Sequence, residues 1–119
     1  MSYVDGCVLA VPTANKSSYQ QHAEYCVDIF REYGMEKLVE CWGDDIPEGE
    51  VTSFPMAVKL EKDESVVFSW ITWPDKETAD AAMEPTMKEL EQMMGGDMSK
   101  MPFDGMRMIW GGFETIVEA

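Results

Sequence analysis

The stretch Val66-Val67-Phe68-Ser69-Trp70-Ile71-Thr72-Trp73 decides the fold, because it is the clearest strand in the sequence. Branched and aromatic residues dominate it, and Pro74 stops it because proline cannot extend a hydrogen-bonded ladder. Both faces of this strand carry large apolar side chains, whereas a sheet covered on one side alternates apolar and polar residues. We therefore expect a sheet that is buried on both faces.

The flanking sequence predicts five further elements, which are strands at 3–11, 35–42 and 106–117 and helices at about 16–33 and from 75 through about 84. Asn15 and Asp75 are the expected N-caps, because their side chains accept hydrogen bonds from the first helical N–H groups. Gly34 is expected to end the first helix in the left-handed conformation. Pro85 predicts a kink or a restart in the second helix, which then continues to Gly95.

Residues 43–64 form a long connection in which turn signals such as Pro47-Glu48-Gly49 interrupt any regular pattern. We expect at most a short strand over 56–60. A connection of this length is often a lid or a partner-binding arm. In the last strand, Gly111-Gly112 indicates a bulge or a close backbone approach.

The element order is strand, helix, strand, strand, helix, strand. This order predicts an α+β, ferredoxin-like βαββαβ fold, in which a four-stranded antiparallel sheet carries two helices on one face. A chain of 119 residues fits one such domain over 1–119.

The predicted fold leaves one face of the sheet without a covering layer. Two helices cover one face, and the other would then expose a large apolar patch. We expect this open sheet face to pack against the same face of a second copy, as in a dimeric α/β barrel. An unidentified protein of another kind is the alternative partner.

The charge balance excludes two classes of partner. The chain has 23 Asp and Glu against 9 Lys and Arg, for a net charge of -14. Such a chain repels phosphate backbones and anionic lipid, so we expect no nucleic-acid or membrane partner. No apolar run approaches the roughly 20 residues of a membrane helix, and the first residues lack the basic leader of a signal peptide.

Three cysteines, Cys7, Cys26 and Cys41, lie on predicted strands or helices and not in a CxxC pair. We interpret them as reduced, buried thiols of a cytoplasmic protein, with a catalytic nucleophile as the alternative. The sequence contains none of the common motifs of nucleotide-binding proteins and hydrolases, namely GxGxxG, Walker, GxSxG and HExxH.

His22 and Arg107 are candidate ligand-binding residues. His22 is the single histidine and lies beside the apolar stripe of the first helix, where it either faces a helix-to-sheet cavity as a general base or makes an ordinary hydrogen bond near the surface. Arg107 either holds a ligand carboxylate or pairs with Asp104 or a neighbouring strand.

Trp42 and Trp70 complete the set of candidates, because a tryptophan that lines a cavity favours a flat or apolar ligand. Oxygen ligands in the acidic loop that begins at Asp44 suit a hard cation, but no EF-hand spacing is present and we favour a solvated turn. The methionines between 83 and 108 suit either a thioether copper site or a pliable core. We expect no metal and no cofactor.

Several segments resemble one known family. They are Tyr3-Val4-Asp5-Gly6, Val11-Pro12-Thr13-Ala14-Asn15-Lys16, Val39-Glu40-Cys41-Trp42-Gly43-Asp44-Asp45, Phe54-Pro55-Met56-Ala57-Val58-Lys59, Val67-Phe68-Ser69-Trp70 and Met101-Pro102-Phe103-Asp104-Gly105 with Arg107-Met108. Together they are similar to the YbaA-like family of bacterial proteins of unknown function (domain of unknown function 1428). The resemblance implies a ferredoxin-like fold of the dimeric α/β barrel superfamily and no established activity.

These observations lead to one functional expectation and two alternatives. We expect a homodimer that binds a small apolar or aromatic metabolite in a helix-to-sheet pocket. The first alternative is a cofactor-free monooxygenase or isomerase of the same superfamily with His22 as the base, and the second is a structural or regulatory dimer without a ligand. The sequence does not decide whether the protein is an enzyme.

Overall fold

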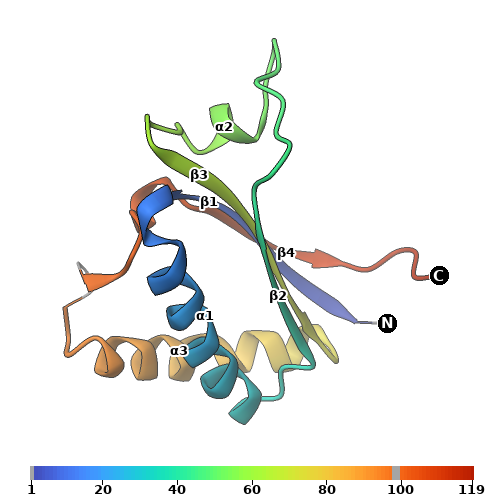
Figure 1. Cartoon of the computed structure of the whole chain (residues 1–119). Coiled ribbons are helices and arrows are strands. Elements are labelled where there is room, and N and C mark those ends of the chain that lie inside the picture. Colours follow the sequence, from blue (N-terminus) through green and yellow to red (C-terminus); the bar gives the residue numbers. More distant parts are fainter. Residues whose placement is uncertain (1, 98–99) are drawn as a thin grey trace.

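A computed structural model describes residues 2–97 and 100–119, and within these ranges the strands form a single antiparallel sheet. The order of its strands is β2-β3-β1-β4. Their bounds are Tyr3–Pro12 for β1, Lys37–Trp42 for β2, Glu64–Trp73 for β3 and Ile109–Glu114 for β4. Both ends of the chain lie at the same end of this sheet (Figure 1). The α+β, ferredoxin-like arrangement predicted from the sequence is therefore confirmed.

Two long helices lie on the same face of the sheet (Figure 1), namely α1 (Lys16–Glu32) and α3 (Lys76–Met93). Asp75 caps α3 as predicted, because its carboxylate accepts a 2.7 Å hydrogen bond from the Thr78 N–H. Gly34 and Gly95 adopt the left-handed conformation after the two helices, with φ angles of 100° and 67°. The sequence thus sets the boundaries of the helical layer.

The register of the strands decides which side chains face the helices. Cys7 of β1 pairs with Ser69 of β3 and with Trp110 of β4, so these residues share a face. The helix-facing side buries two clusters, which contain Leu9, Val11, Tyr19 and Val67 in one and Met35, Trp73, Ala79 and Ala82 in the other. The core of the molecule is therefore the layer between the sheet and the two helices.

The opposite face is covered at one end by the long connection. The expected short strand over 56–60 is wrong, because Phe54–Ala57 forms the single helical turn α2. Pro55 lies in its first turn and the Ser53 hydroxyl accepts the Met56 N–H, and both features favour a helix start. Val58, which follows α2, is 1% exposed and packs with Val8, Ala10 and Val66. The connection thus covers the end of the sheet near α2 (Figure 1).

The last strand is shorter than predicted. Asp104 caps a 3-10 turn over Gly105–Arg107, and this turn delays the strand to Ile109. The pairing of β4 with β1 runs without interruption from Ile109 to Glu114, so the expected bulge at Gly111-Gly112 is not formed. The close approach is confirmed instead, because a Cβ at Gly112 would collide with the Tyr3 ring.

The predictions for Asn15 as a helix cap and for Pro85 as a helix interruption differ from the structure. Asn15 makes no side-chain cap, because the chain enters α1 through a 3-10 turn, and its Nδ2 instead donates to the Pro102 carbonyl at 3.1 Å. No restart occurs at Pro85, and α3 runs through it. Ala82 and Leu90, on either side of the proline, are both buried, and this packing outweighs the helical hydrogen bond that proline removes.

No helix among the described residues is long and apolar enough to cross a membrane.

Candidate functional site

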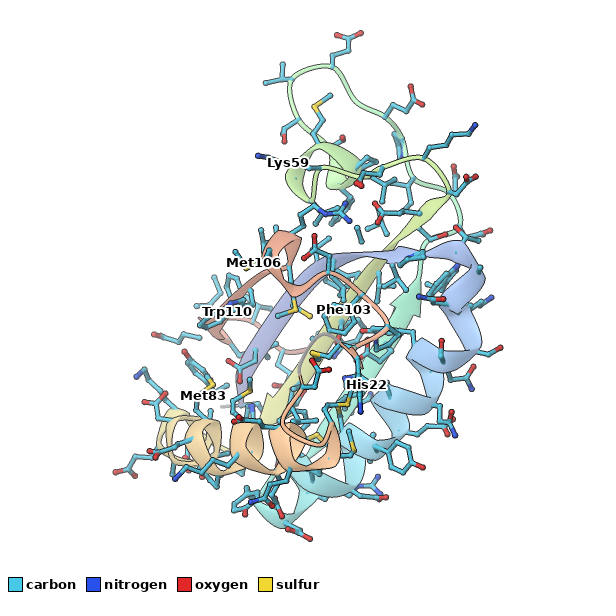
Figure 2. The ribbon with its side chains drawn as sticks, turned by 90° about the vertical axis from the view of Figure 1, so that its left-hand side faces the viewer. His22, Lys59, Met83, Phe103, Met106 and Trp110 are labelled. Carbon is cyan, nitrogen blue, oxygen red and sulfur yellow. The ribbon has the colours of Figure 1, made fainter. Side chains whose placement is uncertain are left out.

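A cavity of about 230 Å³ lies between the sheet and the helical layer. Its floor is the helix-facing side of the sheet, and its walls come from α1, α3 and the segment that leads from α3 back to β4. Figure 2 looks onto this side, with His22 and Phe103 next to each other and Met83 and Trp110 towards the other edge. The apolar lining is rich in aromatic and thioether groups, which belong to Phe30, Trp73, Met83, Met87, Met101, Phe103, Met108 and Trp110.

One row of side chains crosses the whole floor of the cavity. Trp110 of β4 pairs with Cys7 of β1, Cys7 pairs with Ser69 of β3, and Ser69 pairs with Glu40 of β2. All four residues line the cavity. Three of them are polar, whereas Leu9, Leu38 and Ile71 beside them on the same face are apolar. The pleat of four strands therefore places a polar row under an apolar chamber.

Glu40 is the acidic end of this row. The Tyr19 hydroxyl of α1 donates a 2.7 Å hydrogen bond to its Oε1 atom, and Ser69 also hydrogen-bonds its carboxylate. Burial raises the pKa of Glu40 above its ordinary value, and the hydrogen bonds from Tyr19 and Ser69 oppose that rise. Burial and the charge of Glu40 in turn raise the pKa of Tyr19. The Tyr19 hydroxyl therefore stays protonated at neutral pH and can donate to Glu40.

A second carboxylate lines the cavity on the neighbouring part of the floor. The indole Nε1 of Trp73 donates a 2.9 Å hydrogen bond to Oδ2 of Asp5, and both residues line the cavity. Burial raises the pKa of Asp5, the bond from Trp73 lowers it, and the charge of Asp80 raises it. Asp5 is therefore held in a fixed orientation by the buried indole.

His22 lines the cavity from α1, where the sequence places it beside the apolar stripe. Its Nε2 atom lies 3.7 Å from Sγ of Cys26, one helical turn along, and its ring meets Phe103 edge-on at 5.9 Å. Burial lowers the pKa of His22, so the neutral imidazole is favoured. The role of His22 as a general base stays a prediction.

The cysteines are free, but only Cys26 is buried, so the expectation of three buried thiols is wrong. Cys41 is exposed because β2 is an edge strand and its side chain lies on the side away from the helices. Burial is the main cause that raises the pKa of Cys7 to about 11 and that of Cys26 to about 12. Both groups in the cavity are thus thiols at neutral pH and weak nucleophiles.

Arg107 lies away from the cavity and already holds a carboxylate. Its two terminal nitrogens donate to the two oxygens of Glu64, each at 2.7 Å, and its Nε donates to Asp104 at 3.1 Å. A further bond reaches the Lys59 carbonyl at 3.0 Å. Arg107 therefore joins the end of the long connection to β3 and to the turn before β4.

The two tryptophan candidates are separated by the sheet. Trp42 lies on the helix-facing side next to Tyr19, in a groove beside the cavity that it shares with Lys16. Trp70 lies on the opposite face, where it packs with Phe68 and lines a shallow hollow. Of the four predicted residues only His22 lines the cavity, and the structure does not bring the four into one site.

The sequence reasoning missed Asp5, Glu40 and Ser69. Their signal is a polar residue at a helix-facing position of an otherwise apolar strand. This signal is readable only after the register is known, because a shift of one residue would place each of them on the other face.

Metal ligation receives no support from the arrangement of acidic and sulfur groups. Among the described residues, no group of three or more His, Cys, Asp and Glu is placed to hold a metal ion. Among the methionines between 83 and 108, Met83, Met87, Met101 and Met108 line the cavity, whereas Met93 and Met106 are exposed.

Comparisons with known proteins give a family without an activity. A family model described as "Protein of unknown function (DUF1428)" matches residues 2–105. The uncharacterized protein YbaA of Escherichia coli (strain K12) is 49% identical over 118 residues, which cover 99% of each chain, and that of Shigella flexneri matches equally. A solved structure titled "De novo designed protein Foldit4" aligns with a TM-score of 0.46 and 10% identity over 97% of this chain and 98% of that chain.

Proposed function

The chain belongs to the DUF1428 family, which is described as being of unknown function, so we propose from the site alone that this protein binds a small, largely apolar molecule in the cavity between the sheet and the helices. The single observation that carries the proposal is a chamber of about 230 Å³ with an apolar, aromatic lining and a few convergent polar groups. Ligand sites of soluble proteins have this composition.

The volume of the cavity limits the size of its ligand. An apolar cavity of about 150 Å³ is large enough to hold benzene. A cavity of about 230 Å³ therefore accommodates one aromatic ring with a short side chain. Met83 and Met87 line it from α3 with side chains that are nearly half exposed, so they form a pliable entrance.

Calorimetric titration tests this proposal with three compounds that share one ring, namely 2-phenylethanol, 2-phenylethylamine and phenylacetate. We expect saturable binding of at least one of them to the wild-type protein. Met87→Trp is expected to weaken that binding at least tenfold, because the larger ring obstructs the entrance. Met93→Trp is the matched control on the same helix, since Met93 is exposed and does not line the cavity. Binding by none of the three, or equal binding by both variants, contradicts the proposal.

The proposed assembly is a homodimer formed through the open sheet face. Beyond the part covered by the long connection, this face exposes apolar side chains around a hollow of about 640 Å³. They include Phe113 at 59% and Phe68 at 43%, whose ring also meets Phe54 of α2. The chain also exposes 7918 Å², about 1,400 Å² more than the about 6,500 Å² typical of a monomer of this mass. An excess of that size matches the roughly 1,000–2,500 Å² that each subunit of an obligate dimer buries.

The proposed compartment is the cytoplasm. The three free cysteines support it, because thiols persist in a reducing environment.

A further inference from the structure

Glu40 and Asp5 both line the cavity, yet no Lys or Arg of the described ranges lines it with them. A carboxylate that loses water on folding is normally paired with a cation. The same chain shows that pattern elsewhere, where Arg107 binds both oxygens of Glu64. Lys16 shares the neighbouring groove with Glu40, but its Nζ lies over the Trp42 ring, 5.6 Å from the centroid. The cavity thus holds two carboxyl groups that no Lys or Arg of its lining pairs with.

We propose that the ligand of the cavity is an organic cation, a protonated amine on an aromatic or short apolar body, whose ammonium group binds the Glu40 carboxylate. This inference rests on the proposed function, because it assumes that the cavity is a binding site. It adds the chemical class of the ligand.

The hydrogen bonds of Glu40 leave capacity for such a group. An ionised carboxylate accepts about four hydrogen bonds. Glu40 receives one from Tyr19 and one from Ser69, so an ammonium group with three donors finds free acceptor positions on it. Asp5, with one oxygen held by Trp73, adds negative potential from the neighbouring part of the floor.

The apolar part of the lining also suits a cation. The rings of Trp110, Phe103 and Phe30 line the cavity, and the faces of aromatic rings attract positive charge. The net charge of -14 attracts cations towards the protein and repels anionic ligands. A bare metal ion fits poorly, because the described residues offer no cluster of three ligands.

The same three compounds test the inference, since they differ only in the group at the end of the side chain. We expect 2-phenylethylamine to bind at least about tenfold more tightly than 2-phenylethanol, because the ammonium group adds the attraction of opposite charges to the hydrogen bond that either compound donates to the carboxylate. Phenylacetate is expected to bind most weakly. Glu40→Gln, which keeps an acceptor for Tyr19, is expected to reduce the affinity for the amine to that for the alcohol and to leave the alcohol unchanged.

Glu91→Gln is the matched control, because it removes the same charge from an exposed position of α3 that does not line the cavity. It is expected to leave the preference for the amine intact. If the alcohol or phenylacetate binds as tightly as the amine, the inference is overturned while the proposed function stands. Equal losses in Glu40→Gln and Glu91→Gln would assign the preference to net charge and overturn the role of Glu40. Binding by none of the compounds overturns both proposals.

Discussion

The hydroxyl of Tyr19 on α1 donates a 2.7 Å hydrogen bond to the carboxylate of Glu40 on β2, and this bond joins the helical layer to the floor of the cavity. Tyr19 is buried, and its ring also packs edge-on against Phe103 at a centroid distance of 5.7 Å. One residue therefore fixes both the acidic group in the cavity and the segment that covers it.

Tyr19→Phe tests this bond. The variant keeps the ring but removes a donor that stabilises the charged form of Glu40, so the pKa of Glu40 is expected to rise further. The lost hydrogen bond is expected to lower the free energy of unfolding by about 1 kcal/mol. Carbon-13 NMR titration of the Glu40 carboxyl measures the first effect and urea unfolding the second. An unchanged Glu40 pKa would show that the bond does not form in solution.

Glu40→Gln is expected to change how stability depends on pH. The pKa of Glu40 is raised above 4.5, so between 4.5 and its folded value the folded state binds more protons than the unfolded state. The free energy of unfolding of the wild type therefore falls as pH rises through that window. The variant lacks this contribution, so it gains stability relative to the wild type over the same window. Urea unfolding between pH 4 and 8 measures the difference, and a constant difference contradicts the account.

Arg107→Ala is expected to lower the melting temperature by several degrees, because it leaves the largely buried carboxylate of Glu64 without its cation. Arg107 holds the pKa of Glu64 below 4.5, so this contribution is present above that value and is lost as pH falls through the lowered pKa. The gap between wild type and variant should therefore narrow in acid. Lys88→Ala is the control, since its pair with Glu84 is exposed and is expected to contribute less than about 0.5 kcal/mol. If the difference in melting temperature persists in acid, the lost stability comes from the packing of the Arg107 side chain and not from its charge.

Phe68→Asp and Phe113→Asp test the open sheet face. Each variant places a charge in the proposed interface, where burying it without a partner is costly, so both are expected to be monomers at concentrations where the wild type is a dimer. Light scattering measures the mass. Tyr25→Asp on α1 is the control, because Tyr25 is similarly exposed and lies outside that hollow. A monomeric wild type, or dissociation by the control as well, would contradict the proposed dimer.

The order of helices and strands could be predicted from the sequence, because the residues that start and stop them act locally. Pro74 and Asp75 mark the end of β3 and the start of α3, and Gly34 marks the end of α1. The helix α2 was missed because Ser53-Phe54-Pro55 is a start signal too short to show helical periodicity. The strand β4 is shorter than predicted because Asp104 caps a 3-10 turn before it. The apolar residues from Met106 onward look like a continuous strand in the sequence and give no sign of this turn.

The candidate site was accessible only in part. His22 lines the cavity from the position beside the apolar stripe of α1 that the sequence indicates, and its part in binding stays a prediction. Glu40 and Ser69 become neighbours only through the pairing of β2 with β3, and Arg107 meets Glu64 across 43 residues of chain. Such pairs depend on register and topology, which a single sequence does not specify.

The proton-detected NMR signal of the Trp73 indole tests the central claim most directly, because this Nε1–H is bonded to Asp5 inside the cavity. Titration with 2-phenylethylamine is predicted to shift that signal saturably and to shift the backbone amides of Cys7 and Ser69 at the same affinity. If the ligand leaves the Trp73 signal in place, or moves only the indole signal of Trp70 on the opposite face of the sheet, the cavity is not the binding site.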